Sequence, residues 1–394
     1  KGSKPISMVY AGHQFGNWVP RLGDGRAILL GETIDKKNCR WDIQIKGGGK
    51  TPFSRNGDGR ATIGPVLREY LISEYINTLK IPSTRALSAF ITGEKIRRET
   101  SLPGAILTRV AKSHVRVGSF QYYSSIGDLE SIKTLTNYII NRHYKNILNQ
   151  KYLYKNFLSK VINRQAKLIS KWMSIGFIHG VMNTDNTSII GDTIDYGPCA
   201  FMDYYDPKIV HSSIDTYGRY SFKNQPNICH WNLCQFASSI LHLLDKNDSE
   251  AIKIAQKEID KYPKIYKNFW FKEMKRKLFI NSNLYSDETI IKDLLDIMND
   301  ENLDYTLTFK FIEYCLFKNK SELKKINHLF LDCKNLKKWI YHLKKRLEKE
   351  QVSQTNILNL KTNPSIIPRN HIVETALNKV IKNNDYKDYN QLFK

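Results

Sequence analysis

The sequence predicts an α+β protein with two lobes, a sheet-rich N-terminal lobe with one inserted helix and a large, mostly helical C-terminal lobe. Residues 1–126 are rich in glycine and in short apolar runs that turn signals separate, which is typical of strands. After Gly127 apolar residues recur at helical spacing over long stretches. A chain of 394 residues is long enough for two such lobes. We therefore expect a boundary between 1–126 and 127–394.

In the N-terminal lobe, strand signals flank one helical stretch. Residues 41–46 alternate between apolar and polar with period two, as a strand with two different faces does. Pro65 is a favourable first helical residue, and apolar residues then follow at helical spacing up to Lys80. Further strands are expected at 26–32, 86–92, 104–111 and 115–122.

The C-terminal lobe is expected to be helical on both sides of one compact stretch. Helices are predicted over 129–148 and 151–175, and a segment rich in glycine and aspartate follows at 176–206. Beyond His230 the pattern is helical to the end of the chain. Loop signals interrupt it near 247–249, 281–287 and 363–368.

The net charge of +23 suggests a polyanionic partner: nucleic acid, an acidic membrane surface or a nucleotide. Residues 1–200 hold 29 basic and 14 acidic residues, and residues 201–394 hold 32 and 24, so the surplus is concentrated in the first half. A compositional bias towards lysine is the alternative explanation. No apolar run approaches the roughly 20 residues of a membrane span, and no nucleic-acid-reading motif is recognisable. We therefore expect neither nucleic-acid binding nor membrane insertion.

Six cysteines are too few and too irregularly spaced for a disulfide framework, so a reducing compartment is the default. The segment CHWNLC at 229–234 matches no common zinc pattern and is better explained as buried helix. The chain begins at Lys1 without methionine, so we expect that the native N terminus is missing.

The first motif with chemical meaning is Gly23-Asp24-Gly25-Arg26, directly before a predicted strand. Glycines allow backbone N–H groups to approach phosphate oxygens, and an adjacent arginine can bind phosphate with two hydrogen bonds. By itself the motif is better explained as an ordinary turn.

The second motif is Lys46, which ends an alternating strand and precedes three glycines. The alternation places it on the open face of the sheet together with Asp42 and Gln44. Glu69 lies some twenty residues further on, in the predicted helix. A strand lysine paired with a helix glutamate is how protein kinases orient a phosphate-binding lysine, although strand lysines are often only solvated charges.

The third motif lies in the glycine- and aspartate-rich stretch, where Asp185-Asn186 and Asp195 flank a short apolar hairpin. Hard divalent cations prefer such oxygen ligands and neutralise the charge that develops in phosphoryl or nucleotidyl transfer. Protein kinases carry an aspartate where this chain has Val181. Ordinary transfer of a γ-phosphoryl group to a protein is therefore not favoured.

Four long segments, in this order, resemble the selenoprotein O family, also called the YdiU family: GHQFGNWVPRLGDGRAILLGE, DIQIKGGGKTPFSRNGDGRA, REYLISE and HGVMNTDNTSIIGDTIDYGPCAFMD. The resemblance covers nearly the whole chain. It implies a protein kinase-like fold that binds ATP in a flipped orientation and transfers AMP, with release of pyrophosphate, to side chains of proteins. These acceptors are Ser, Thr, Tyr or His, and transfer of UMP from UTP is also implied.

The resemblance also implies roles for individual residues. Asp185 would accept the proton, Asn186 and Asp195 would hold Mg²⁺ or Mn²⁺, and Glu69 would pair with the phosphate-binding lysine. The residues implied to bind ATP are Gly23, Gly25, Arg26, Lys46, Asp58, Gly59, Arg109, Arg116 and Asp195, with the two later arginines on strands.

Two other functions stay open beside nucleotidyl transfer: an atypical protein kinase, and a nucleotide-binding pseudokinase scaffold without activity. We expect a monomer whose partners are ATP or UTP and protein substrates. The compartment would be the cytoplasm for a bacterial protein or the mitochondrion for a eukaryotic one.

Overall fold

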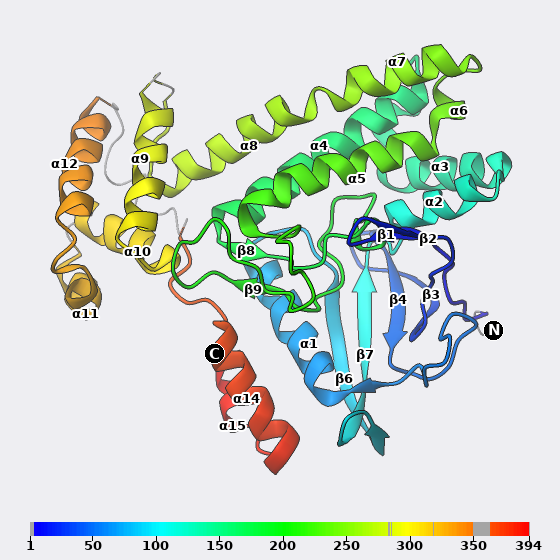
Figure 1. The fold of residues 1–394 in the computed structure, drawn as a ribbon, viewed down its shortest axis with the longest axis horizontal. Helices are drawn as coiled ribbons and strands as arrows, with labels where there is room; N and C mark the ends of the chain where they lie inside the picture. The colour runs from blue at the N-terminus through cyan, green and yellow to red at the C-terminus, as the bar shows by residue number, and fades with distance from the viewer. Residues whose placement is uncertain (1–3, 283, 285, 318, 350–362, 394) are drawn as a thin grey trace.

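The computed structural model describes residues 4–282, 284, 286–317, 319–349 and 363–393. It is a mixed α+β structure in which an antiparallel sheet lies beside a larger assembly of helices (Figure 1). The predicted combination of sheet and helices is confirmed. None of the described helices is both long enough and apolar enough to cross a bilayer.

Five strands form the main sheet, in the order β3-β4-β7-β5, with β6 also paired to β7. Their bounds are β3 Ala27–Ile34, β4 Arg40–Lys46, β5 Ala61–Thr62, β6 Arg85–Arg97 and β7 Ser101–Ala111. The strands predicted at 26–32, 41–46, 86–92 and 104–111 are thus present, the third within a much longer strand. Two small hairpins add β1 Gly12–Gln14 with β2 Asn17–Val19, and β8 Phe177–Ile178 with β9 Ala200–Phe201.

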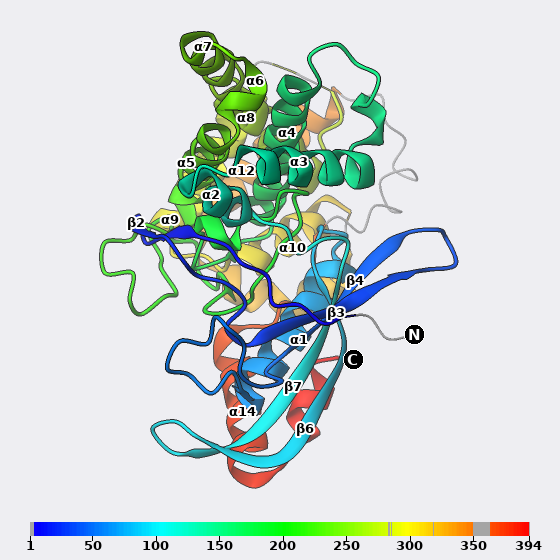
Figure 2. The same cartoon turned by 90° about the vertical axis from the view of Figure 1, so that its right-hand side faces the viewer.

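The predicted inserted helix is α1, Ile63–Thr78, and it packs against β6 and β7. Two helices near the C terminus, α14 (Asn370–Asn383) and α15 (Lys387–Gln391), lie beside α1 (Figure 2). Val373, Leu377 and Val380 join the apolar core of this sheet region. The C-terminal helices therefore pack against the N-terminal sheet and stabilise it. The expected boundary at residue 126 assigns these helices to the other lobe.

The remaining helices form the larger part of the molecule. They are α2 Val117–Ser125, α3 Leu129–His143, α4 Leu153–Ser174, α5 Gln225–Ser239, α6 Leu241–Leu244, α7 Asp248–Ile259, α8 Tyr262–Lys277, α9 Asp287–Asp300, α10 Tyr305–Leu316, α11 Lys320–Ile326 and α12 Lys334–Glu348. Four short 3₁₀ turns complete the elements: η1 Lys145–Ile147, η2 Thr184–Asn186, η3 Phe222–Asn224 and η4 Asn327–Phe330.

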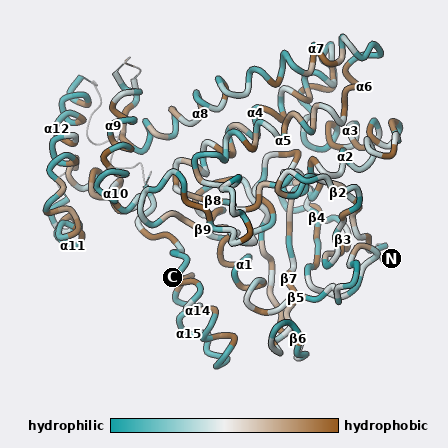
Figure 3. Tube along the Cα trace, viewed as in Figure 1, coloured by the Kyte–Doolittle hydropathy of each residue, from teal (hydrophilic) through white to brown (hydrophobic). Residues whose placement is uncertain are grey.

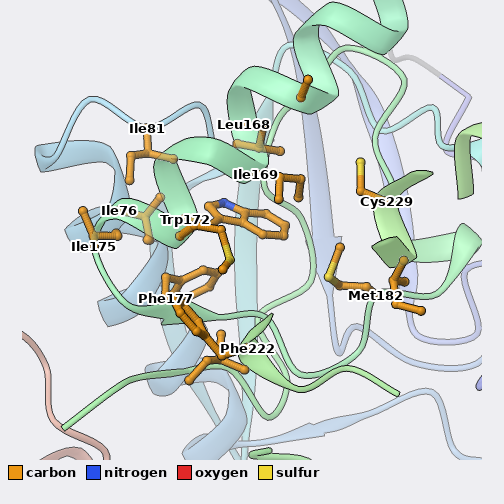
Figure 4. Packing of buried hydrophobic residues seen from close by; sticks show 14 of the residues in the cluster. Ile76, Ile81, Leu168, Ile169, Trp172, Ile175, Phe177, Met182, Phe222 and Cys229 are labelled. Atoms are coloured by element: carbon orange, nitrogen blue, oxygen red, sulfur yellow. The ribbon is translucent and has the colours of Figure 1, made fainter. Parts of the chain in front are cut away.

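Helix α4 is central to this part, because it contacts α5, α7 and α8. Apolar and polar residues follow one another along this helix (Figure 3), and its buried residues recur every three to four positions. Trp172 packs against Phe177 and stacks on His179, inside a cluster that also includes Phe222 and Met182 (Figure 4). The segment that follows α4 is therefore held against the main core.

Two expectations need correction. The strand predicted at 115–122 is wrong, because α2 begins at Val117 and the Ser119 hydroxyl accepts the backbone N–H of Arg116 at its N-cap. Gly118 also lies against the carbonyl of Ala11, so close that a Cβ would clash. The face of β4 that carries Gln44 is not open either, since Gln44 is fully buried beneath a polar network. In both places tertiary contacts override the local pattern.

Candidate active site

A cleft of about 830 Å³ lies between the sheet and the helical part, and we call it the front cleft. Its walls contain ten of the twelve site residues expected from the sequence: Gly23, Gly25, Arg26, Lys46, Asp58, Gly59, Arg109, Arg116, Asn186 and Asp195. Glu69 and Asp185 are buried behind the wall. The fold thus brings together residues that lie up to 172 positions apart.

At the centre of the front cleft, two cations share two carboxylates. Lys46 Nζ lies 2.7 Å from Glu69 Oε2 and 3.6 Å from Asp195 Oδ1. Arg109 forms ion pairs with both Glu69 and Asp195. Burial opposes ionisation of the two carboxyl groups, but Arg109 and Lys46 outweigh it and lower the pKa of both, that of Asp195 most. Both carboxylates are therefore charged at neutral pH and fixed by the two cations.

Arg116 adds a third cation on the opposite side of Asp195. Its guanidinium lies 3.6 Å from Asp195 Oδ2 and 3.9 Å from Asp24 Oδ1, and it covers the ring of Tyr10 at 4.5 Å. Gln44 connects the two halves, because it donates to Asp24 Oδ2 at 3.1 Å and accepts from Arg109 at 3.3 Å. Arg116 stands at the start of α2 and not on a strand, contrary to the sequence-based expectation.

Asp195 has a left-handed backbone with φ of 63°. Such a conformation is costly for a residue other than glycine, and it is often retained where a side chain must be aimed at a ligand. Asn186 donates from Nδ2 to the carbonyl of Val181 at 3.0 Å, which orients its amide within the cleft wall.

Asp185 is held by the N-terminal hairpin. Gln14 Nε2 donates to Asp185 Oδ2 at 3.3 Å, whereas Asp185 Oδ1 is buried without a hydrogen-bond partner among the described residues. The backbone N–H of His13 donates to Thr184 Oγ1 at 2.8 Å, and a Cβ on Gly12 would stand 2.9 Å from Asp185 Oδ1. Burial raises the pKa of Asp185 to about 6, with Arg116 acting in the opposite direction. A carboxyl group with this pKa can take up a proton near neutral pH.

The two GDGR segments differ in their contacts. Gly23 has φ of +124° and lies against the ring of Phe53, while Gly59 has φ of +68° and lies against the carbonyl of Gly49. Neither position has room for a side chain. The carboxylate of Asp58 is bound to Arg98 through two hydrogen bonds of 2.8 and 3.0 Å, and it caps the turn at Arg60.

An oxygen-binding divalent cation fits the donor set of the front cleft. Asn186 and Asp195 are partly buried and both line it, and Asp185 Oδ1, buried without a partner among the described residues, adds an oxygen in the same loop region. In the described part of the chain, no three His, Cys, Asp or Glu side chains lie together so that they could bind a metal ion. An amide oxygen and oxygens from the substrate would therefore have to complete the coordination.

Sequence reasoning missed several residues of this site. Tyr10, Gln14 and Asp24 lie inside or beside the GHQFGNW and GDGR segments, yet no spacing rule assigns them a function. Arg97 and Arg98 also line the cleft, at the end of β6. Only their positions and contacts in the folded chain identify these residues.

Comparison with known proteins gives a consistent result. The family model described as "Protein adenylyltransferase SelO" matches residues 1–394. The chain is 51% identical over 389 residues to the protein nucleotidyltransferase YdiU of Clostridium botulinum strain Hall, covering 97% of this chain and 76% of the relative. It is 49% identical to that of Bacillus cereus (98% and 78%) and 46% identical to that of Bradyrhizobium sp. strain ORS 278 (100% and 80%).

Proposed function

Because the chain belongs to the protein adenylyltransferase SelO family and is a nucleotidyltransferase enzyme, we propose that the front cleft binds ATP and transfers AMP to hydroxyl side chains of other proteins. The observation that carries this proposal is the arrangement of Lys46 and the buried Arg109 and Arg116 around Asp195, next to a carboxyl group with a raised pKa. The curated relatives are bacterial, and a cytoplasmic location stays a prediction.

The proposed reaction is a substitution at the α-phosphorus. The acceptor hydroxyl oxygen forms a bond to this phosphorus, the bond to the bridging oxygen of the β-phosphate breaks, and pyrophosphate leaves. Asp185 takes the hydroxyl proton, for which its pKa of about 6 is suited. Lys46 and the arginines of the cleft stabilise the charge that moves onto the departing pyrophosphate.

The charge balance of the site supports a metal-bound nucleotide. Lys46, Arg109 and Arg116 lie among Glu69, Asp195 and Asp24, so the formal charges of the six cancel. A triphosphate therefore needs further positive charge. Arg26 and Arg97 line the same cleft without an ion pair among the described residues, whereas Arg60 and Arg98 are paired with Glu94 and Asp58. We propose that Asn186 and Asp195 hold Mg²⁺ or Mn²⁺, which when bound neutralises phosphate charge.

A kinase-like, two-lobed arrangement is part of the proposal. The pairing of Lys46 on β4 with Glu69 on α1 supports it, as does the entry of Asn186 and Asp195 from the helical side. The missing aspartate at Val181 and the proximity of Asp185 to Asn186 favour nucleotidyl over γ-phosphoryl transfer.

The deciding experiment uses two labels. The chain is incubated with Mg²⁺ or Mn²⁺, a protein extract, and ATP labelled at either the α- or the γ-phosphate. We expect label on protein only from α-labelled ATP, and an added AMP by intact-mass analysis. Label only from γ-labelled ATP would identify a kinase, and no label from either would identify a non-catalytic scaffold.

Two controls refine this test. Asp195→Ala should abolish labelling, because it removes the carboxylate that three cations and the proposed metal share. Parallel reactions with α-labelled UTP compare the two nucleotides, since the names of the YdiU relatives specify a nucleotidyltransferase without naming the base.

A further inference from the structure

A second cleft of about 840 Å³ lies at the other end of strands β3 and β4, and we call it the rear cleft. Ile34 and Arg40 belong to it, whereas Ala27 and Lys46, at the opposite ends of the same strands, belong to the front cleft. Helices α3 and α4 form its other walls. Seven of its 18 lining residues are Lys or Arg and one, Asp192, is acidic, so the cleft is strongly cationic.

Two of the seven basic residues of the rear cleft are paired with carboxylates, Arg40 with Glu32 and Arg142 with Glu32 and Asp42. The positive charge of three lysines is not neutralised in this way. Lys112, Lys145 and Lys167 form no ion pair with any residue that the structure describes. Arg164 is fixed by backbone carbonyls, donating to His143 O at 2.7 Å, and its guanidinium covers the ring of Tyr144 at 3.9 Å. Its charge is therefore held in place without an ion pair to any described carboxylate, and Asp192 interacts with it only electrostatically.

Two nitrogen atoms in the wall of the rear cleft are buried and lack a hydrogen-bond partner among the described residues. They are Arg142 Nε and His143 Nε2. The pKa of His143 is lowered to about 3, first by burial and then by Arg142 and Arg164, so the surrounding field is positive. An unpaired buried donor such as Arg142 Nε is costly, and an anionic ligand with several acceptor oxygens would satisfy it.

We propose that the rear cleft binds an oligophosphate group, either free or attached to a nucleoside. Three parts of the chain each contribute a lysine to the rear cleft: Lys112 follows β7, Lys145 follows α3, and Lys167 lies on α4. A chain of phosphates offers acceptor oxygens to several such cations at once. The cleft volume is that of an ordinary small-molecule site, and Tyr138 and Leu168 supply partly apolar wall.

The test counts binding sites by titration calorimetry with sodium tripolyphosphate at low ionic strength and without divalent metal. The full chain should bind two equivalents, one in each cleft. The variant Lys112→Gln/Lys167→Gln should lose or weaken one of them at least about tenfold, because charge-assisted hydrogen bonds are removed. The control Lys133→Gln/Lys257→Gln changes two exposed lysines outside both clefts and should bind two equivalents.

The variant Lys46→Met assigns the remaining equivalent, since it weakens the front cleft and should leave rear-cleft binding intact. In that variant, equal affinity for ATP and tripolyphosphate indicates that only phosphate is bound, and tighter ATP binding indicates that the nucleoside also contributes. Both results support the proposal. A single equivalent in the full chain that Lys46→Met abolishes would overturn it, as would two undiminished equivalents in the Lys112→Gln/Lys167→Gln variant.

Discussion

The front and rear clefts have nearly equal volumes and are both rich in basic residues, but they use their charges differently. In the front cleft, Lys46, Arg109 and Arg116 are each paired with a carboxylate. In the rear cleft, Lys112 and Lys167 have no such partner among the described residues. Paired charges fix a geometry for chemistry, whereas unpaired charges provide attraction for an anion.

The largest expected difference follows from removing one cation from each cleft. Arg109→Ala leaves Lys46 as the one described cation that contacts both the buried Glu69 and Asp195, with Arg116 still beside Asp195. We expect a loss of about 3–5 kcal/mol in the free energy of unfolding and a fall in transfer rate of at least about 100-fold. Lys112→Ala should change the free energy by no more than about 0.5 kcal/mol. Urea unfolding and labelled-AMP incorporation measure the two effects, and equal stability of the two variants would contradict the comparison.

A second prediction concerns the tight packing around the front cleft. Gly59 and Gly127 have nearly the same φ, +68° and +70°, but only Gly59 has neighbouring atoms where a Cβ would lie. Gly127→Ala should cost about 1–2 kcal/mol for the left-handed backbone alone. Gly59→Ala should cost a further 1–3 kcal/mol or so, because the clash with the Gly49 carbonyl is added. Thermal unfolding of both variants separates the two contributions, and equal costs would show that the loop relaxes freely.

The third prediction uses the one carboxyl group that lines the rear cleft, Asp192. Burial raises its pKa to about 6, although Lys112 and Arg164 act in the opposite direction, and the Tyr144 phenol also lies within its electrostatic reach. In the unfolded chain the Asp192 carboxyl group loses its proton near pH 3.8, whereas in the folded chain it keeps the proton up to about pH 6. Ionisation therefore favours the unfolded chain, and the free energy of unfolding falls as the pH rises from about 4 to 6.

Above pH 6 that cost is complete, on the order of 3 kcal/mol. Asp192→Asn should therefore unfold at a higher temperature than the parent chain at pH 8, and with little difference at pH 4. Calorimetric scans at the two pH values test this. A variant that is less stable at pH 8 would mean that the ionised carboxylate is more strongly bound by Lys112 and Arg164 than we infer.

Local patterns were sufficient to predict much of the fold. The alternation of residues 41–46 and the apolar spacing after Pro65 correspond to β4 and α1, because burial on one face leaves a direct mark on the sequence. The pairing of Lys46 with Glu69 also follows from their places on these two elements. The functional roles assigned to the individual site residues stay predictions.

Long-range packing could not be predicted in the same way. The segment beginning at Val115 alternates like a strand, but the close approach of Gly118 to Ala11 and the cap at Arg116 make it a helix. The rear cleft also has no sequence signal, since Lys112, Lys145 and Lys167 are separated along the chain and meet only after folding. Charge counting located the surplus in the first half of the chain without separating paired from unpaired cations.

The smallest predicted effect concerns Asp185, which resembles the rear-cleft lysines in having no ion-pair partner among the described residues. Its carboxylate is oriented by a single side-chain hydrogen bond, from Gln14. Gln14 does not line the front cleft, so Gln14→Ala should leave KM for ATP unchanged and lower kcat about 3- to 10-fold, as expected for the loss of one orienting bond. Asn17→Ala, in the same hairpin but without a bond to Asp185, is the matched control. A rise in KM with unchanged kcat would show that Gln14 contributes to nucleotide binding instead, and that the hairpin does not position the proposed proton acceptor.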